Sequence, residues 1–210
     1  MAKKIIKKQI QKTNSKNQEK NFNCVIVGTG GQGLITLLEI LSDAAIKAGY
    51  DTKTSELHGL SQRGGSVEVH IKFGKKVYSP LVEKSKADLI LGLEMQECLK
   101  AGYFAGRQTI YIVNKNITPI PGAVPLTADL IIKALQVFTK NIEVVDADGI
   151  CQKELGTAVV SGIYLLCWAS FKNIIPIPPQ IILEAIKSSV APKYLDLNIK
   201  TWELAQKYSS

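Results

Sequence analysis

The 210-residue sequence lacks any run of about 20 apolar residues, which is the length that a helix needs to cross a bilayer. Its most apolar stretch, 158–171, is shorter and contains Ser161, Gly162 and Ser170. The N-terminus also lacks the apolar segment of a secretory signal and the arginines of a transit peptide. These absences predict a soluble, cytoplasmic protein.

Paired cysteines are missing as well. The four cysteines, Cys24, Cys98, Cys151 and Cys167, are scattered along the chain without a C-x-x-C pair. Zinc sites and iron–sulfur clusters need several converging thiolates, which usually shows as close spacing. We therefore expect reduced thiols and no metal or cluster held by this chain. Paired carboxylates, metal-spaced histidines and a G-x-S-x-G turn are also missing, so we expect no catalytic residue here.

Positive charge is concentrated at one end of the chain. The formal net charge is +8, and residues 1–20 contribute seven lysines against one acid, Glu19. The remaining chain is nearly neutral and shows no basic stripe interleaved with aromatic residues. We predict a disordered basic tail over 1–20, followed by a single domain over 21–210. Such a tail is first of all a solvated arm, and contact with RNA, a membrane or an acidic partner stays open.

Short apolar runs alternate with amphipathic segments along the rest of the chain. Strands are predicted at 23–27, 52–56, 87–93, 109–113 and 142–146, and helices at 34–48, 94–100, 127–138, 149–154, 157–171, 180–188 and 193–207. The alternating run 66–73 predicts a strand with one polar face, joined by a hairpin turn to 77–78. This order predicts an α/β fold, a three-layer Rossmann-like domain with a mostly parallel sheet that the hairpin makes mixed.

The first glycine loop follows the first predicted strand. Gly28-Thr29-Gly30-Gly31-Gln32-Gly33 fits G-x-G-x-x-G between a strand and a helix. Glycines allow close backbone approach, and the following helix N-terminus offers N–H groups to a phosphate. A tight turn that binds nothing is the open alternative. A dinucleotide enzyme also needs an acid after the second strand, where Glu56 lies, but no second crossover helix follows.

The second glycine loop is His58-Gly59-Leu60-Ser61-Gln62-Arg63-Gly64-Gly65, within a predicted loop at 57–65. Because it follows the second strand, we predict that it lies beside the first glycine loop at the carboxyl edge of a parallel sheet. Only two of the 26 Lys and Arg residues are arginines. Arg63 therefore suggests bidentate binding of a carboxylate or phosphate, with carbonyl capping or an ion pair as the alternative. His58 is either an acid–base group or a structural hydrogen bonder.

These motifs carry a family resemblance. The first glycine loop and the run from Ser55 to Gly65 resemble the gamma domain of 2-oxoacid:ferredoxin oxidoreductases. The pattern His-Gly-x-Ser-Gln-Arg-Gly-Gly is similar to the beta subunit of the indolepyruvate (arylpyruvate) branch. The resemblance spans 22–207, with further matches at Tyr78-Ser79-Pro80, 87–94, Glu97, Pro192-Lys193, Leu195, Asn198 and Glu203-Leu204. The chain departs from the family at 157–163, where members often have Asn followed by Leu-Gly-Ala, and in its Lys-rich extension.

The resemblance implies a subunit that holds no cofactor itself and works in a hetero-oligomer with a larger alpha subunit. That partner is expected to bind thiamine diphosphate and magnesium and to carry iron–sulfur clusters, while ferredoxin takes the electrons and coenzyme A the acyl group. Two alternatives are a stand-alone flavin- or NAD-binding enzyme and a nucleic-acid-binding or scaffold protein. The candidate ligand- or partner-binding residues are Gly28, Gly30, Gly31, Gln32, Gly33, Glu56, His58, Gly59, Ser61, Gln62, Arg63, Gly64 and Gly65.

Overall fold

The computed structural model describes residues 20–59, 64–119, 122, 124 and 126–209. The predicted tail therefore lies outside the described residues except for Lys20, whose Nζ lies 2.8 Å from Asp88 Oδ1. Within the described ranges, six strands form one sheet in the order β2-β3-β1-β4-β5-β6. The parallel part comprises β1 (Phe22–Thr29), β4 (Ala87–Gly92), β5 (Ala105–Asn114) and β6 (Ile142–Val145).

The sheet is mixed, as predicted, but for a different reason. β3 (Ser66–Gly74) runs antiparallel to both neighbours, β1 on one side and β2 (Asp51–His58) on the other. The predicted partner strand at 77–78 is wrong, because that described segment is irregular. β2 also continues to His58, so the loop predicted at 57–65 begins after that residue rather than at 57.

The polar face predicted for β3 is not open to water. His70, on that face, is only 1% exposed. Its Nδ1 accepts a hydrogen bond from Val82 N at 3.1 Å, so Nε2 carries the proton and donates to Glu68 Oε1 at 2.8 Å. The Phe104 ring packs edge-on against the imidazole with a centroid separation of 4.9 Å. Val82 of the β3–β4 connection and Phe104 of η1 (Ala101–Phe104) therefore cover His70 on a face that the alternating sequence predicts to be wet.

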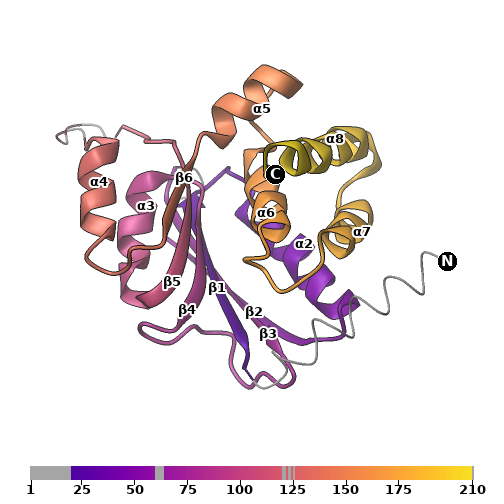
Figure 1. Ribbon diagram of the computed structural model, residues 1–210, viewed down its shortest axis with the longest axis horizontal. Coiled ribbons are helices and arrows are strands. Elements are labelled where there is room, and N and C mark those ends of the chain that lie inside the picture. Colours follow the sequence, from indigo (N-terminus) through magenta and orange to yellow (C-terminus); the bar gives the residue numbers. More distant parts are fainter. Residues whose placement is uncertain (1–19, 60–63, 120–121, 123, 125, 210) are drawn as a thin grey trace.

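Helices cover both faces of the sheet and give three layers (Figure 1). One face carries α3 (Met95–Lys100), the 3-10 helix η1 (Ala101–Phe104) and α4 (Ala128–Leu135). The other carries α2 (Leu34–Lys47), α6 (Ser161–Phe171), α7 (Pro179–Ser189) and α8 (Pro192–Ser209), with α5 (Ala147–Leu155) packed on α6 and α8. The α/β class and the predicted helices are confirmed. α6 begins later than predicted because 158–161 form a turn, closed by Ser161 N donating to Ala158 O at 3.0 Å.

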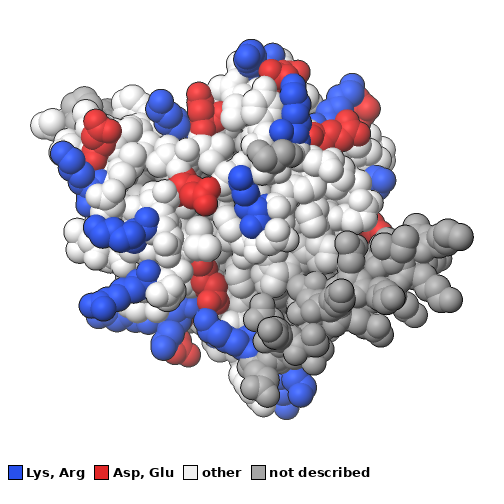
Figure 2. All heavy atoms as spheres, in the orientation of Figure 1, with Lys and Arg blue, Asp and Glu red and all other residues white. Residues whose placement is uncertain are grey.

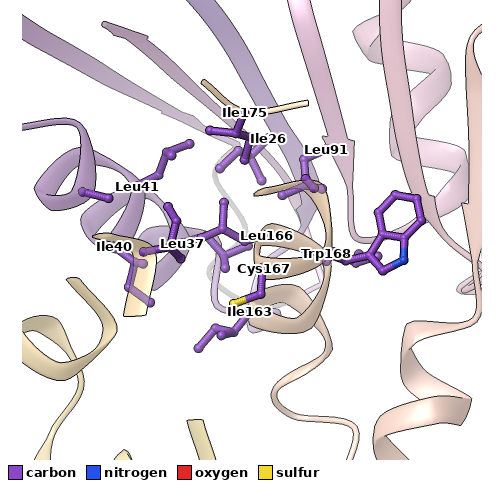
Figure 3. Close-up of a cluster of buried hydrophobic side chains, with 14 of the residues drawn as sticks. Ile26, Leu37, Ile40, Leu41, Leu91, Ile163, Leu166, Cys167, Trp168 and Ile175 are labelled. Carbon is purple, nitrogen blue, oxygen red and sulfur yellow. The ribbon is translucent and has the colours of Figure 1, made fainter. Parts of the chain in front are cut away.

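Helix α6 is the centre of the larger core. Its side chains from Gly162 to Ser170 are buried, so it is apolar on every side rather than on one stripe. Figure 3 shows Ile163 and Leu166 packed toward Leu37 of α2, with residues of the sheet closing the cluster. A Cβ on Gly162 would lie 3.1 Å from Leu37 Cδ1, which explains a glycine at this close approach.

The four cysteines are all free and buried in these cores. Burial raises the pKa of the Cys151 thiol to about 12 and holds the other three thiols well above their ordinary pKa range. They are therefore protonated, unreactive core residues at neutral pH. Among the described helices, none combines the length and the apolar character needed to cross a membrane.

Candidate functional site

The first glycine loop lies at the topological switch point of the sheet. β1 leads into α2 on one face, whereas the adjacent parallel strand β4 leads into α3 on the opposite face. Open α/β sheets bind ligands in the crevice at such a point, outside the carboxyl ends of the strands. The sequence therefore places its G-x-G-x-x-G motif where the topology opens a crevice.

The glycines of this loop have two different reasons for being glycine. Gly31 and Gly33 have φ values of +104° and +79°, and a Cβ added at either would meet no described atom within 4 Å. Gly28 instead is crowded, because a Cβ there would lie 2.6 Å from Gln32 Oε1 and 3.1 Å from Leu93 Cβ. The loop is thus tightly packed at its base and open at its tip.

Helix α2 starts without a capping side chain. Gly33 occupies the N-cap, no side chain in the described part of the protein caps it, and the first turn has no acidic residue. The first N–H groups of a helix have no acceptor within the helix, and they carry a partial positive charge. This arrangement favours an anionic group outside the open tip of the loop.

Gln32 was predicted to face a ligand or a partner, but its side chain is used inside the turn. Its Oε1 accepts from Thr29 N at 2.8 Å, and its Nε2 donates to Leu93 O at 3.4 Å. Its backbone N–H also closes the turn onto Thr29 O at 3.2 Å. Gln32 therefore fixes the shape of the loop and connects it to the neighbouring turn after β4.

The structure brings the two glycine loops together. Gly30 N donates to Gly65 O at 2.8 Å, and Gly64 N donates to Gly30 O at 3.3 Å. The proximity agrees with the prediction, but the expected route, parallel pairing of the first two strands, is wrong. The loops meet because β3 lies next to β1, with Ser66 opposite Thr29.

Glu56 and His58 lie apart from the first glycine loop, on the edge strand β2. His58 Nε2 is 3.3 Å from Glu56 Oε2, and the two side chains are 52% and 35% exposed. Gly59, also exposed, donates its N–H to Ser66 O at 3.4 Å. Because β3 separates β2 from β1, Glu56 does not take the place of the ribose-binding acid of a dinucleotide enzyme. Ser61, Gln62 and Arg63, with Leu60, lie outside the described residues, so their role stays a prediction.

Sequence reasoning missed the turn between β4 and α3, which lies directly beside the first glycine loop. Glu94 is 1% exposed and caps α3, since its Oε2 accepts from Glu97 N at 2.8 Å. Its Oε1 accepts from Thr118 N at 2.9 Å. Glu97, 7% exposed, accepts from Ser66 Oγ and from Lys100 Nζ, the latter at 2.7 Å. Both acids were noted only as family matches, because Glu is not a preferred N-cap residue.

A second polar network, also missed, fastens the end of β5. The buried Asn114 donates from Nδ2 to Leu93 O at 3.3 Å and to Asp148 Oδ1 at 2.8 Å. Its Oδ1 accepts from Ala147 N at 3.1 Å, at the start of α5. A polar residue at the end of a buried strand, here Asn114, is the sequence signal that could have indicated this network. Together with Gln32, this network makes Leu93 O a junction shared by β1, β4 and β5.

A cavity of about 460 Å³ adjoins the open tip of the first glycine loop. Its other walls come from the start of α6 and from the junction of α7 and α8. They are mostly apolar, with Val160, Ile163, Val190, Tyr194 and Leu197 among them. The segment 157–163, where the sequence departs from the family pattern, thus contributes directly to this wall. The uncapped end of α2 opens onto an apolar groove.

Within the described ranges, no group of three or more His, Cys, Asp or Glu side chains is arranged to hold a metal ion. Figure 2 shows basic and acidic side chains interspersed on the face in view. The crevice at the switch point is therefore the candidate site.

The fold and this crevice define a Rossmann-like α/β protein with a glycine loop at the switch point. Residues 23–208 match the family described as pyruvate ferredoxin/flavodoxin oxidoreductase, and the chain belongs to that family. It is 34% identical over 194 residues to indolepyruvate oxidoreductase subunit IorB of Thermococcus kodakarensis, covering 90% of this chain and 96% of the relative. It is also 34% identical over 188 residues to the protein of that name from Archaeoglobus fulgidus, covering 87% and 92%. The family resemblance is confirmed.

Solved structures share the fold at low sequence identity. Pyruvate oxidoreductase subunit PORC of Thermotoga maritima has a TM-score of 0.67 at 20% identity, covering 90% of this chain and 97% of that one. The 2-oxoglutarate:ferredoxin oxidoreductase of Magnetococcus marinus, solved with 2-oxoglutarate, coenzyme A and succinyl-CoA bound, gives 0.70 at 13% identity. There the match covers 91% of this chain but 31% of the other, so the same fold forms part of a longer chain.

Proposed function

We propose that the chain is the smaller, non-thiamine-binding subunit of a 2-oxoacid:ferredoxin oxidoreductase of the indolepyruvate type. The complex would oxidatively decarboxylate an aryl 2-oxoacid, form the acyl-CoA and reduce ferredoxin. The observation that carries this proposal is the match, over nearly the whole chain, to relatives named as indolepyruvate oxidoreductase subunits.

The larger subunit would hold thiamine diphosphate, magnesium and iron–sulfur clusters. Thiamine diphosphate supplies the carbanion chemistry of decarboxylation when it is bound. The Magnetococcus enzyme supports such a division, since the fold of this chain corresponds to about a third, 31%, of that longer chain. On this proposal the present chain completes the assembly and shapes one side of the active site.

The first glycine loop would bind a phosphate of coenzyme A. The uncapped first turn of α2 offers N–H donors and no competing acid, which suits an anion. The adjoining cavity of about 460 Å³ would take the less polar arm of the same molecule. Coenzyme A is bound in the Magnetococcus enzyme, which supports it as the ligand of this class. Arg63 would add a bidentate cation, while Glu56, His58 and Gly59, on the exposed end of β2, would face the partner.

The complex is the direct test of this function. The chain would be produced together with a thiamine-binding larger subunit from the same genome, and ferredoxin reduction measured with indolepyruvate and coenzyme A. We expect a stable hetero-oligomer whose activity requires both substrates. If the two subunits do not associate, or if the complex does not reduce ferredoxin with indolepyruvate as substrate, the proposed function is wrong.

The coenzyme A assignment has its own test. Arg63→Ala should raise the KM for coenzyme A by about tenfold, the usual effect of losing a charge-assisted hydrogen bond. Arg107→Ala is the matched control, because it removes the other arginine, which is exposed and lies on β5. An unchanged KM for coenzyme A in Arg63→Ala would contradict the proposal that the glycine loops bind coenzyme A. It would not affect the proposal that the chain is the smaller subunit.

A further inference from the structure

We infer that Glu97 is a positioning residue that holds the two glycine loops against each other by way of Ser66. This inference rests on the proposed function only in naming coenzyme A as the ligand. Glu97 belongs to α3 and to neither loop, and no sequence motif connects it with them. It acts on the loops through Ser66, and we do not place it in contact with a ligand.

A short chain of contacts leads from Glu97 to the first loop. Glu97 Oε2 accepts a hydrogen bond from Ser66 Oγ. Ser66 is the first residue of β3 and lies opposite Thr29, the last residue of β1. Its preceding neighbour, Gly65, provides the carbonyl that accepts from Gly30 N at 2.8 Å. A displacement of Ser66 therefore moves the acceptor that holds the tip of the first loop.

Glu97 is itself held by two further hydrogen bonds, one to its backbone and one to its carboxylate. Its backbone N–H donates to Glu94 Oε2 at 2.8 Å, which fixes the start of α3 beneath it. Its second oxygen accepts from Lys100 Nζ at 2.7 Å. Glu97 is 7% exposed, whereas the Lys100 side chain is 59% exposed. The bond to Ser66 joins α3 to β3 and is the orienting contact, whereas the lysine, mostly in solvent, is a counter-ion.

Glycine-rich loops need such an external hold. The segments 28–33 and 64–65 contain few side chains that could fix them, and glycine has the greatest conformational freedom in the unfolded chain. Gln32 anchors the base of the first loop, while the second loop is attached to it by backbone hydrogen bonds at Gly30. The Glu97–Ser66 bond adds a side-chain contact from a buried helix at the place where those bonds begin.

Four variants of the assembled complex separate positioning from general stability. Ser66→Ala and Glu97→Ala remove the orienting bond, Glu97→Gln keeps an acceptor for Ser66, and Lys100→Ala removes only the counter-ion. For the first two we expect about tenfold faster hydrogen exchange at the Gly30 and Gly64 amides and a similar rise in the KM for coenzyme A. We expect kcat to stay within about twofold, because no group that contacts the reacting atoms is lost. Glu97→Gln and Lys100→Ala should resemble the unmodified complex.

The result that overturns the inference is equally specific. Exchange at Gly30 and Gly64 that is unchanged in Ser66→Ala, or Lys100→Ala behaving like Glu97→Ala, would show that the carboxylate does not position the loops. Loss of exchange protection across the whole sheet in Ser66→Ala would assign the bond a purely structural role and would also overturn it. If exchange responds while the KM for coenzyme A does not, the positioning role stands and the coenzyme A assignment fails.

Discussion

The turn from β1 into α2 and the turn from β4 into α3 leave adjacent parallel strands at the same edge of the sheet, but their helices begin differently. The first has Gly33 at its N-cap, no capping side chain from the described residues, and no described atom within 4 Å of a Cβ added at Gly31 or Gly33. The second has Glu94 at its N-cap, almost fully buried and accepting from two backbone N–H groups.

The difference indicates how the crevice is built. A helix start that is satisfied internally has nothing left to offer a ligand, whereas an uncapped start keeps its N–H groups available. The β4–α3 turn is therefore a closed wall behind the first glycine loop, and the β1–α2 turn, which lines the cavity, is the binding side. Leu93 O, which accepts from both Gln32 and Asn114, joins the wall to the strands on either side.

The largest effect should come from breaking the wall. Glu94→Ala leaves the N–H groups of Glu97 and Thr118 without their acceptor in a buried place. We expect a loss of about 3 kcal/mol in the free energy of unfolding, since each orphaned buried donor costs roughly 1–3 kcal/mol. Denaturant unfolding measures it, with the exposed Glu203→Ala as the control. If Glu94→Ala lowers the free energy of unfolding no more than Glu203→Ala does, the Glu94 cap does not stabilise the fold.

The next effect concerns the open turn, and α2 supplies its own matched pair. Gly33 and Gly49 lie at opposite ends of α2, have φ values of +79° and +87°, and have no described atom within 4 Å of an added Cβ. Alanine at either position should cost about 1 kcal/mol of stability through backbone strain alone. Equal losses in denaturant unfolding are expected. A much larger loss for Gly33→Ala would indicate packing that the structure does not contain.

Gln32→Ala should have a similar or smaller effect on stability, about 1 kcal/mol, because it removes one hydrogen bond to Thr29 N and a longer one to Leu93 O. The more informative measurement is hydrogen exchange at Thr29, which should become faster. Exchange that does not change would show that the side chain does not close the turn.

The smallest effect concerns alkylation of Cys98, which should not react in the folded protein. Cys98 lies under the capped turn, where its Sγ donates to Glu94 O at 3.4 Å and burial raises its pKa well above the ordinary range. Iodoacetamide at pH 8 should leave Cys98 unmodified in the folded protein but label it in Glu94→Ala during transient opening of α3. Rapid labelling of the unmodified protein, followed by peptide mass spectrometry, would contradict the closed wall.

Local patterns in the sequence predicted most of the fold but not its pairings. Strand and helix positions follow from periodicity, and the helix predicted at 34–48 matches α2 to within one residue. The insertion of β3 between β2 and β1 was missed because strand order depends on contacts distant in sequence. The burial of His70 was missed for the same reason, since Phe104 and Val82 come from other segments. For the site, the glycine loops were recognisable, whereas Glu94 and Glu97 gain their meaning only from Thr118 and Ser66 across the edge.

The most direct test of the central claim, that the open turn is the binding side of the crevice, is a titration of the assembled complex with coenzyme A. It compares Gly33→Ala with Gly49→Ala, whose costs in stability are matched. Gly33 lines the cavity and is the N-cap of α2, so we expect a methyl group there to lower the affinity for coenzyme A at least about tenfold. Gly49→Ala should bind like the unmodified complex. Equal affinity for both variants would contradict the account.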